Sequence, residues 1–145
     1  MPSLDNMMLR QIIMDHYENP RNHELVEDDS YKKVNMDSET CIDNIDIQAK
    51  IENGVIEDIR FDGEACAICT SSTSIMTELL IGKTIDEARV IIENYMNMIF
   101  EKDYDPEILE EAIAFYNTHK QANRIKCATL GWKGITQLID ESEKE

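Results

Sequence analysis

The feature that most constrains the fold is an alternating run of residues that ends at Asn53-Gly54. Between Asp43 and Glu52, apolar residues occupy every second position, as in a strand with one wet face: Ile45, Ile47, Ala49 and Ile51. Asn-Gly is the strongest short hairpin signal, because a tight primed turn needs positive φ at both central residues. The sequence therefore predicts that this strand pairs antiparallel with residues 55–61.

The second strand of this hairpin falls out of step with the first. A two-residue turn pairs Ile51 with Ile56, yet Ile59 and Phe61 have the opposite parity. One extra residue near Glu57-Asp58 restores the match, so we predict a β-bulge there. After a turn at residues 62–63, we expect a short third strand over residues 65–68.

The rest of the chain has helical patterns. Thr84 with Glu87 forms a capping box, and Asp105-Pro106 is typical of a helix start. His16 falls on the apolar face of the first helix and is predicted to be a packing residue. The helices are expected over residues 4–16, 71–80, 85–99, 106–116 and 127–139, followed by a frayed acidic tail, 140–145. The predicted fold class is α+β: one domain, residues 1–145, with a three-stranded antiparallel sheet and helices packed on one side.

Charge narrows the possible partners. Lys and Arg number 14 and Asp and Glu number 30, which gives a net charge of −16. That field repels phosphate backbones and anionic lipids, so we expect neither nucleic acid nor a membrane as partner. No apolar run approaches the ~20 residues that span a bilayer, and the first residues lack a signal-peptide pattern. The expected location is the cytoplasm.

Four cysteines in a reducing compartment favour metal binding or catalysis, although a free cysteine is also a common small core residue. Cys41 and Asp43 are two positions apart, so in an extended chain their side chains share one side, about 7 Å apart at the backbone. A thiolate and a carboxylate placed so can converge on one cation. An exposed loop cysteine beside an exposed aspartate explains this pair equally well.

Cys66-Ala-Ile-Cys69 lies where a strand gives way to a helix. This spacing occurs in zinc knuckles, in thioredoxin-type redox pairs and in half of an iron–sulfur site. A second Cys-x-x-Cys is missing, which weakens the knuckle, and prolines at positions 2, 20 and 106 cannot supply the proline-bearing strand of a thioredoxin. If the strand continues to residue 69, only one of the two thiols can join the ion, and we favour Cys66.

Cys127 is expected to open the last helix, behind Arg124 and Lys126. Free N–H groups and positive charge favour the thiolate, which is the form that binds metal and attacks sulfur. Three thiolates and one carboxylate form a tetrahedral set that suits Zn²⁺. Such a site is closed, and it becomes reactive only when a partner displaces one ligand.

Taken together, these motifs resemble the SufU proteins, the zinc-bearing branch of the IscU/NifU N-terminal-like family of iron–sulfur assembly proteins. Lys126 stands where IscU proteins carry a ligand histidine, and residues 98–121 look like the insertion of the SufU branch. The resemblance covers nearly the whole chain and rests on His16-Tyr-Glu-Asn-Pro-Arg-Asn22, Cys41-Ile-Asp43, Phe61-Asp-Gly-Glu-Ala-Cys-Ala-Ile-Cys69 and Arg124-Ile-Lys-Cys-Ala-Thr-Leu-Gly-Trp132.

The resemblance implies a zinc-dependent sulfur-transfer protein. Cys41, Asp43, Cys66 and Cys127 would hold Zn²⁺, and a pyridoxal-phosphate cysteine desulfurase would dock and release Cys41 to accept sulfur as a persulfide. Arg124 is expected to pair with Asp43 or to steady the released thiolate. The sulfur then passes to downstream iron–sulfur assembly proteins.

Three other functions stay open. The chain could be a scaffold that builds a [2Fe–2S] cluster on its three cysteines, with iron as the metal. It could be a thiol–disulfide oxidoreductase that uses Cys66 and Cys69, or an adaptor with a structural zinc. Three positions depart from the family pattern: Ile42 and Ala65 stand in place of glycines, and Cys69 stands in place of serine, where it offers a spare ligand or a resolving thiol.

Overall fold

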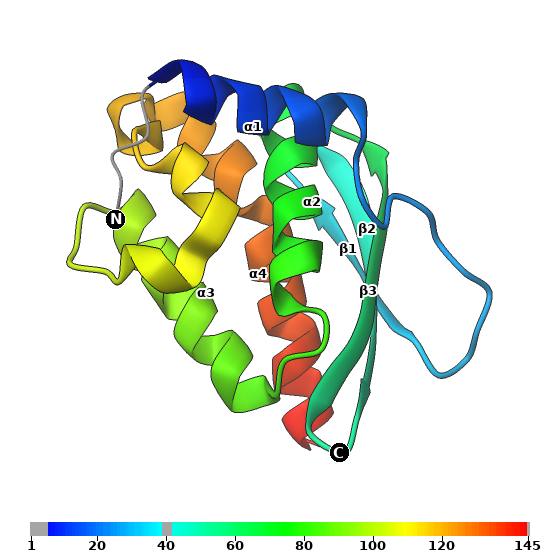
Figure 1. Ribbon diagram of the computed structural model, residues 1–145. Coiled ribbons are helices and arrows are strands. Elements are labelled where there is room, and N and C mark those ends of the chain that lie inside the picture. Colours follow the sequence, from blue (N-terminus) through cyan, green and yellow to red (C-terminus); the bar gives the residue numbers. More distant parts are fainter. Residues whose placement is uncertain (1–5, 39–41, 145) are drawn as a thin grey trace.

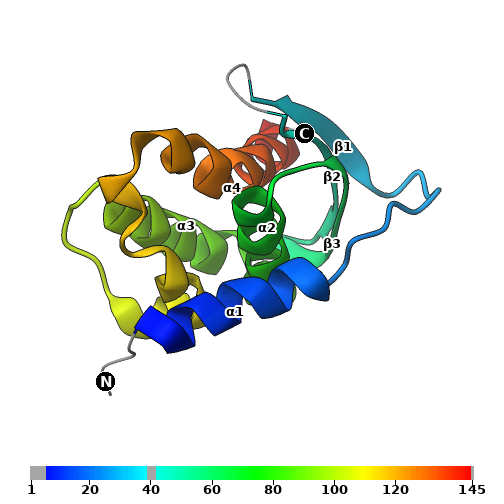
Figure 2. The same cartoon turned by 90° about the horizontal axis from the view of Figure 1, so that it is seen from above.

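The computed structural model describes residues 6–38 and 42–144 and has an α+β fold (Figure 1). One three-stranded antiparallel sheet has the order β1-β2-β3, and the helices cover one of its faces (Figure 2). The predicted fold class is therefore confirmed. The elements are α1 (Asn6–Glu18), β1 (Lys32–Asp37), β2 (Asn44–Glu52), β3 (Val55–Glu64), α2 (Ala67–Leu80), α3 (Ile85–Ile99), the 3-10 helices η1 (Pro106–Phe115) and η2 (Thr118–Lys120), and α4 (Ala122–Lys144).

The β2–β3 hairpin forms as its sequence predicts. Asn53 and Gly54 have φ of 54° and 74°, the positive values that a primed turn requires. Ile51 pairs with Ile56, whereas Lys50 pairs with Asp58, so one extra residue, Glu57, is inserted into β3. The predicted bulge is confirmed, and it returns the later apolar residues of β3 to the buried face.

The third strand is not the predicted one. Residues 65–68 do not form a strand, because β3 continues without a turn through Glu64 and Cys66 then caps α2. Gly63 permits this continuation: its φ is 133°, and a Cβ there would lie 2.3 Å from the Asn44 carbonyl oxygen of β2. The third strand is instead β1, an edge strand in the acidic stretch, in which only Val34 and Met36 are partly buried.

The helices are mostly confirmed, with corrections at their ends. α1 matches the predicted first helix and ends two residues later, while residues 4–5 lie outside the described part of the chain. The capping box of α3 is present, with Thr84 Oγ1 accepting from the Glu87 N–H at 3.1 Å. η1 starts at Pro106 as predicted, but it is a 3-10 helix, broken by the left-handed Glu110 (φ 46°).

α4 is longer than predicted at both ends. It begins at Ala122, five residues before Cys127, and continues through Lys144. The tail is therefore not frayed over residues 140–144, and Glu145 lies outside the described residues. Ion pairs of Arg89 on α3 with Asp140 and Glu143 explain the extension, because they hold the last turns of α4 against α3.

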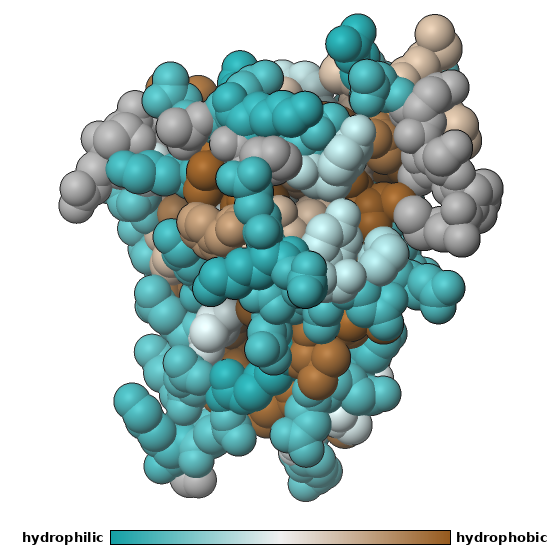
Figure 3. All heavy atoms as spheres, turned by 90° about the vertical axis from the view of Figure 1, so that its left-hand side faces the viewer, coloured by the Kyte–Doolittle hydropathy of each residue, from teal (hydrophilic) through white to brown (hydrophobic). Residues whose placement is uncertain are grey.

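The core lies between the sheet and the helices. The buried face of β2 and β3 packs on α2 and α4, and the largest fully buried side chains are Trp132, Tyr95, Phe61 and Phe115. Hydrophilic residues cover most of the side of the molecule shown in Figure 3, with smaller apolar areas between them. Within the described ranges, the helices are all too short or too polar to cross a bilayer.

Candidate metal centre

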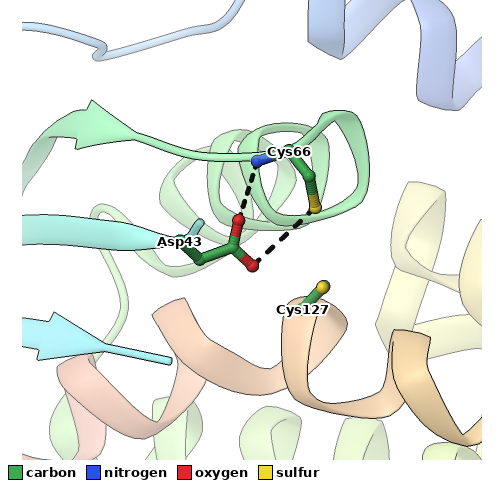
Figure 4. Close-up of side chains that lie close together, drawn as sticks. All are labelled: Asp43, Cys66 and Cys127. Carbon is green, nitrogen blue, oxygen red and sulfur yellow. Dashed lines mark hydrogen bonds between the residues drawn. The ribbon is translucent and has the colours of Figure 1, made fainter. Parts of the chain in front are cut away.

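Three of the four predicted metal ligands meet at one end of the sheet (Figure 4). Asp43 directly precedes β2, Cys66 joins β3 to α2, and Cys127 lies on α4. One ligand atom from each of these side chains lies within 4.8 Å of the other two. The fourth predicted ligand, Cys41, lies outside the described residues.

Hydrogen bonds fix the Asp43 carboxylate beside Cys66. Asp43 Oδ1 accepts from the Cys66 N–H at 2.7 Å, and Asp43 Oδ2 lies 3.7 Å from Cys66 Sγ. The Asp43 backbone carbonyl also accepts from the Ser38 N–H at 2.8 Å, which ties the ligand to the chain after β1. Both sulfur atoms and the carboxylate point toward one another (Figure 4).

The donor set fits a borderline-soft divalent cation. Asp43 is fully buried, and burial of a carboxylate is costly unless a counter-charge or several donors compensate. Cys127 is 4% exposed and Cys66 is partly buried, so a bound ion would be shielded from water. Two thiolates and one carboxylate suit Zn²⁺ and leave one tetrahedral position for a further ligand.

The helix N-terminus at this site belongs to Cys66 and not to Cys127. Cys127 lies more than one turn inside α4, where the helix dipole no longer acts strongly. The prediction that free N–H groups of a helix start favour its thiolate is therefore wrong. Cys66 is the N-cap of α2, and its Sγ accepts from the Cys69 N–H at 3.4 Å. The preference for Cys66 over Cys69 agrees with the geometry, because the Cys69 side chain is fully buried in the core and outside the three-residue cluster.

Arg124 lies on α4 one turn before Cys127 and is exposed. It lines a hollow of about 380 Å³ together with residues of α1 and with Ile68, which follows Cys66 by two positions. Its predicted role beside Asp43 stays a prediction. His16 is fully buried and hydrogen-bonded to Ser74 at 2.8 Å, so it lies on the packed face of α1, as predicted.

A buried hydroxyl network, which was not predicted from the sequence, holds α4 against α2 and α3. Ser72 Oγ and Tyr95 Oη both donate to the Ala128 carbonyl, each at 2.7 Å. Trp132 Nε1 donates to Ser72 Oγ at 3.0 Å, and its ring stacks on Tyr95 with centroids 3.9 Å apart. Because Ala128 follows Cys127 directly, the network sets the position of that ligand. Burial raises the pKa of Tyr95, so its hydroxyl stays a donor. The available signal was the run of small polar residues in α2, Thr70 to Ser74.

Comparisons with known proteins agree with this architecture. Residues 8–141 match the model of the NifU-like N-terminal domain. The chain is 38% identical over 137 residues to the zinc-dependent sulfurtransferase SufU of Bacillus subtilis. The aligned region covers 94% of this chain and 92% of that protein. It is 32% identical to the iron–sulfur cluster assembly scaffold protein IscU of Streptococcus pyogenes, over 94% of this chain and 86% of that protein.

Solved structures have the same fold. A putative iron–sulfur cluster assembly scaffold protein for the SUF system from Fervidobacterium islandicum superposes with a TM-score of 0.79 at 31% identity, over 87% of this chain and 92% of that chain. A NifU-like N-terminal protein from Brucella abortus shares the fold, with a TM-score of 0.80 at 22% identity, over 93% of this chain and 94% of that chain. The resemblance seen in the sequence is confirmed: this chain belongs to the NifU-like N-terminal family of iron–sulfur cluster assembly proteins.

Proposed function

We propose that this chain is a zinc-dependent sulfur acceptor that serves iron–sulfur cluster assembly in the cytoplasm. The observation that carries the proposal is the convergence of Asp43, Cys66 and Cys127 within 4.8 Å of one another. The relative that is 38% identical to the chain is named for this activity. Cys41 is proposed as the fourth ligand, since its place two residues before Asp43 keeps its Cα within about 7 Å of the Asp43 Cα.

When bound, zinc would hold the ligand sulfurs as thiolates, ready for exchange. The proposed partner is a pyridoxal-phosphate cysteine desulfurase that carries a persulfide on its own cysteine. The Cys41 thiolate attacks the outer sulfur of that persulfide, the partner's S–S bond breaks, and its electron pair returns to the partner's cysteine as thiolate. Sulfur moves from one thiolate to another with no net oxidation, and downstream assembly proteins then receive it.

The described residues favour Cys41 as the point of exchange. Ile42 is 66% exposed, whereas Asp43 is fully buried, so the chain enters the core between these two positions. Cys66 caps the N-terminus of α2 and Cys127 lies within α4, and both helices pack in the core. A partner can therefore contact Ile42, which directly follows Cys41 in the chain, without disturbing the packing of the three described ligands. Arg124 is proposed to steady the released thiolate, because it lies one turn before Cys127 on the same helix.

The test combines elemental analysis with sulfur transfer. Freshly purified wild type should hold one equivalent of zinc and should accelerate a cysteine desulfurase, and mass spectrometry should find the added sulfur on Cys41. Cys41→Ala should lose the acceleration and the persulfide. Ser142→Ala, a change on α4 far along the chain from the ligands, is the matched control and should behave as wild type. A Cys41→Ala protein that still accelerates the desulfurase would contradict the proposal.

The second candidate is a scaffold for a [2Fe–2S] cluster, which is favoured by the IscU scaffold proteins among the relatives. The same three thiols and one carboxylate would then ligate iron. Anaerobic purification decides between the two: a brown protein with visible charge-transfer absorbance indicates the scaffold, and a colourless zinc protein indicates the sulfur acceptor. A thiol–disulfide oxidoreductase is disfavoured, because the Cys69 side chain is fully buried.

A further inference from the structure

A second cluster of ligating side chains lies away from the cysteines, where α1, α2 and η1 meet. It consists of His16 on α1, Glu78 on α2 and Glu111 on η1, with one ligand atom from each within 4.8 Å of the other two. We infer that these three residues form a second metal site, for a divalent transition-metal cation that takes nitrogen and oxygen ligands. The inference is independent of sulfur transfer at the cysteine centre.

The distances are close to those of a coordination sphere. His16 Nε2 lies 3.3 Å from Glu111 Oε1 and 3.8 Å from Glu78 Oε1. Ligand atoms bonded to one ion at about 2.0–2.2 Å lie about 3.0–3.6 Å from each other. The glutamate side chains are 47% and 49% exposed, so they are free to make the small rotations that binding requires.

The imidazole is held as a metal ligand needs to be. His16 is fully buried, and its Nδ1 lies 2.8 Å from Ser74 Oγ, which also accepts from the Arg21 N–H at 2.8 Å. Metal-binding histidines ordinarily donate their other ring N–H to such a partner. When Nδ1 carries the proton and donates to Ser74, Nε2 turns a lone pair toward the two carboxylates. When Nε2 carries it, that N–H donates to Glu111, so both tautomers keep the ring hydrogen-bonded.

Charge and access also favour a cation. A hollow of about 230 Å³, open to solvent, is lined by Glu78, Glu110 and Glu111 together with two apolar residues of α2. Arg21 also lies at this cluster: its Nε is 3.6 Å from Glu78, and its Nη2 binds Asp15 at 2.7 Å. One imidazole, carboxylates and water suit Mn²⁺, Fe²⁺ or Zn²⁺, whereas the thiolates of the first centre select zinc.

Mn²⁺ tests the inference because it disfavours thiolate ligands. Zinc-loaded full-length protein, with one equivalent of zinc, is titrated with Mn²⁺ while the EPR signal of the free ion is followed. We expect wild type to take up one equivalent, and Glu78→Gln and Glu111→Gln each to weaken binding at least about tenfold. Glu93→Gln on α3, which removes the same charge from an exposed position outside the cluster, is the matched control and should bind as wild type does.

A second readout reports on His16 itself. Diamagnetic Zn²⁺, added beyond the first equivalent, should move the ¹⁵N resonances of the His16 ring to those of the Nδ1–H tautomer in wild type and not in Glu111→Gln. Equal Mn²⁺ uptake by wild type and both cluster variants would overturn the inference. Absence of uptake at millimolar Mn²⁺ would do so too, and would leave hydrogen bonding between α1, α2 and η1 as the role of the cluster. Persulfide formation on Cys41 should be the same in all these variants, so failure here is distinguishable from failure of the proposed function.

Discussion

Replacing Ser72 by alanine should destabilise the protein more than replacing Tyr95 by phenylalanine. Both hydroxyls donate to the Ala128 carbonyl at 2.7 Å, so either change leaves that carbonyl with one of its side-chain donors. Tyr95→Phe therefore removes one hydrogen bond, with a net cost of about 0.5–1.5 kcal/mol. Ser72→Ala also removes the acceptor of the Trp132 indole N–H, in a residue that is fully buried.

An unsatisfied buried donor costs about 1–3 kcal/mol in addition to the lost bond, so Ser72→Ala should cost about 1.5–4.5 kcal/mol in total. The measurement is urea unfolding of the zinc-loaded proteins, followed by Trp132 fluorescence. For a domain of this size, the difference between the two variants corresponds to a melting temperature lower by about 2–4 °C for each kcal/mol. Ser142→Ala, the control in the last turns of α4, should stay within about 0.5 kcal/mol of wild type.

A refuting result is a Ser72→Ala protein that is as stable as Tyr95→Phe, since the indole would then have found another partner. The double variant adds a further check. Because Ser72 and Tyr95 lie 3.1 Å apart and share one acceptor, the costs of the two changes should not simply add. Additive costs within experimental error would show that the two hydroxyls act independently, and that this network does not hold α4 as a unit.

Three further predictions concern other parts of the fold. Chelation of the metal should lower the free energy of unfolding, by about 4 kcal/mol where free zinc had exceeded its Kd a thousandfold. Chelation should change the stability of Cys127→Ser little, because that variant lacks a ligand. An unchanged melting curve after complete removal of the metal would show that the site does not stabilise the fold. Gly63→Ala should lower the free energy of unfolding by more than about 2 kcal/mol, because the φ of Gly63 is 133° and a Cβ would lie 2.3 Å from the Asn44 oxygen. Gly54→Ala, which has open space around its Cβ, should cost less in the same denaturant measurement. The Tyr31 hydroxyl donates to Asp58 at 2.5 Å, which raises the pKa of Tyr31 from 10 to about 12. The contribution of this bond to stability is therefore complete below pH 10 and is lost as pH rises through 12. Tyr31→Phe should show less of this loss when the free energy of unfolding is measured across that range, and identical pH profiles for the two proteins would contradict the assignment.

Local chemistry made some elements predictable from the sequence. The β2–β3 hairpin and its bulge follow from the Asn53-Gly54 turn and from the parity of apolar residues, both of which act within a few positions. The start of α3 follows from Thr84 and its capping box for the same reason. These local preferences do not depend on tertiary contacts, so the elements that they predict form in the folded protein.

Elements decided by long-range contacts were not predictable. β1 is an edge strand in which only Val34 and Met36 alternate with polar residues, a pattern too short to predict a strand, and it forms because β2 offers it a free edge to pair with. The first turn of α4 precedes Cys127 without an apolar pattern, and its last turns depend on Arg89 of α3. The metal centre stands between these cases: residue types and spacing suggested Asp43, Cys66 and Cys127, but only the sheet, α2 and α4 together bring them to one point.

The way in which the three described ligands are held explains where exchange can occur in the proposed function. Asp43 is fixed by the Cys66 N–H and lies fully buried, and Cys127 is fixed through the contacts of Ala128 with Ser72 and Tyr95. Moving either one would disturb the packing of the sheet or of α4, which is costly in a close-packed core. Ile42, which directly precedes Asp43, is instead 66% exposed. A partner that must detach one ligand therefore meets least resistance on that side, and the persulfide should form on Cys41 and on neither Cys66 nor Cys127.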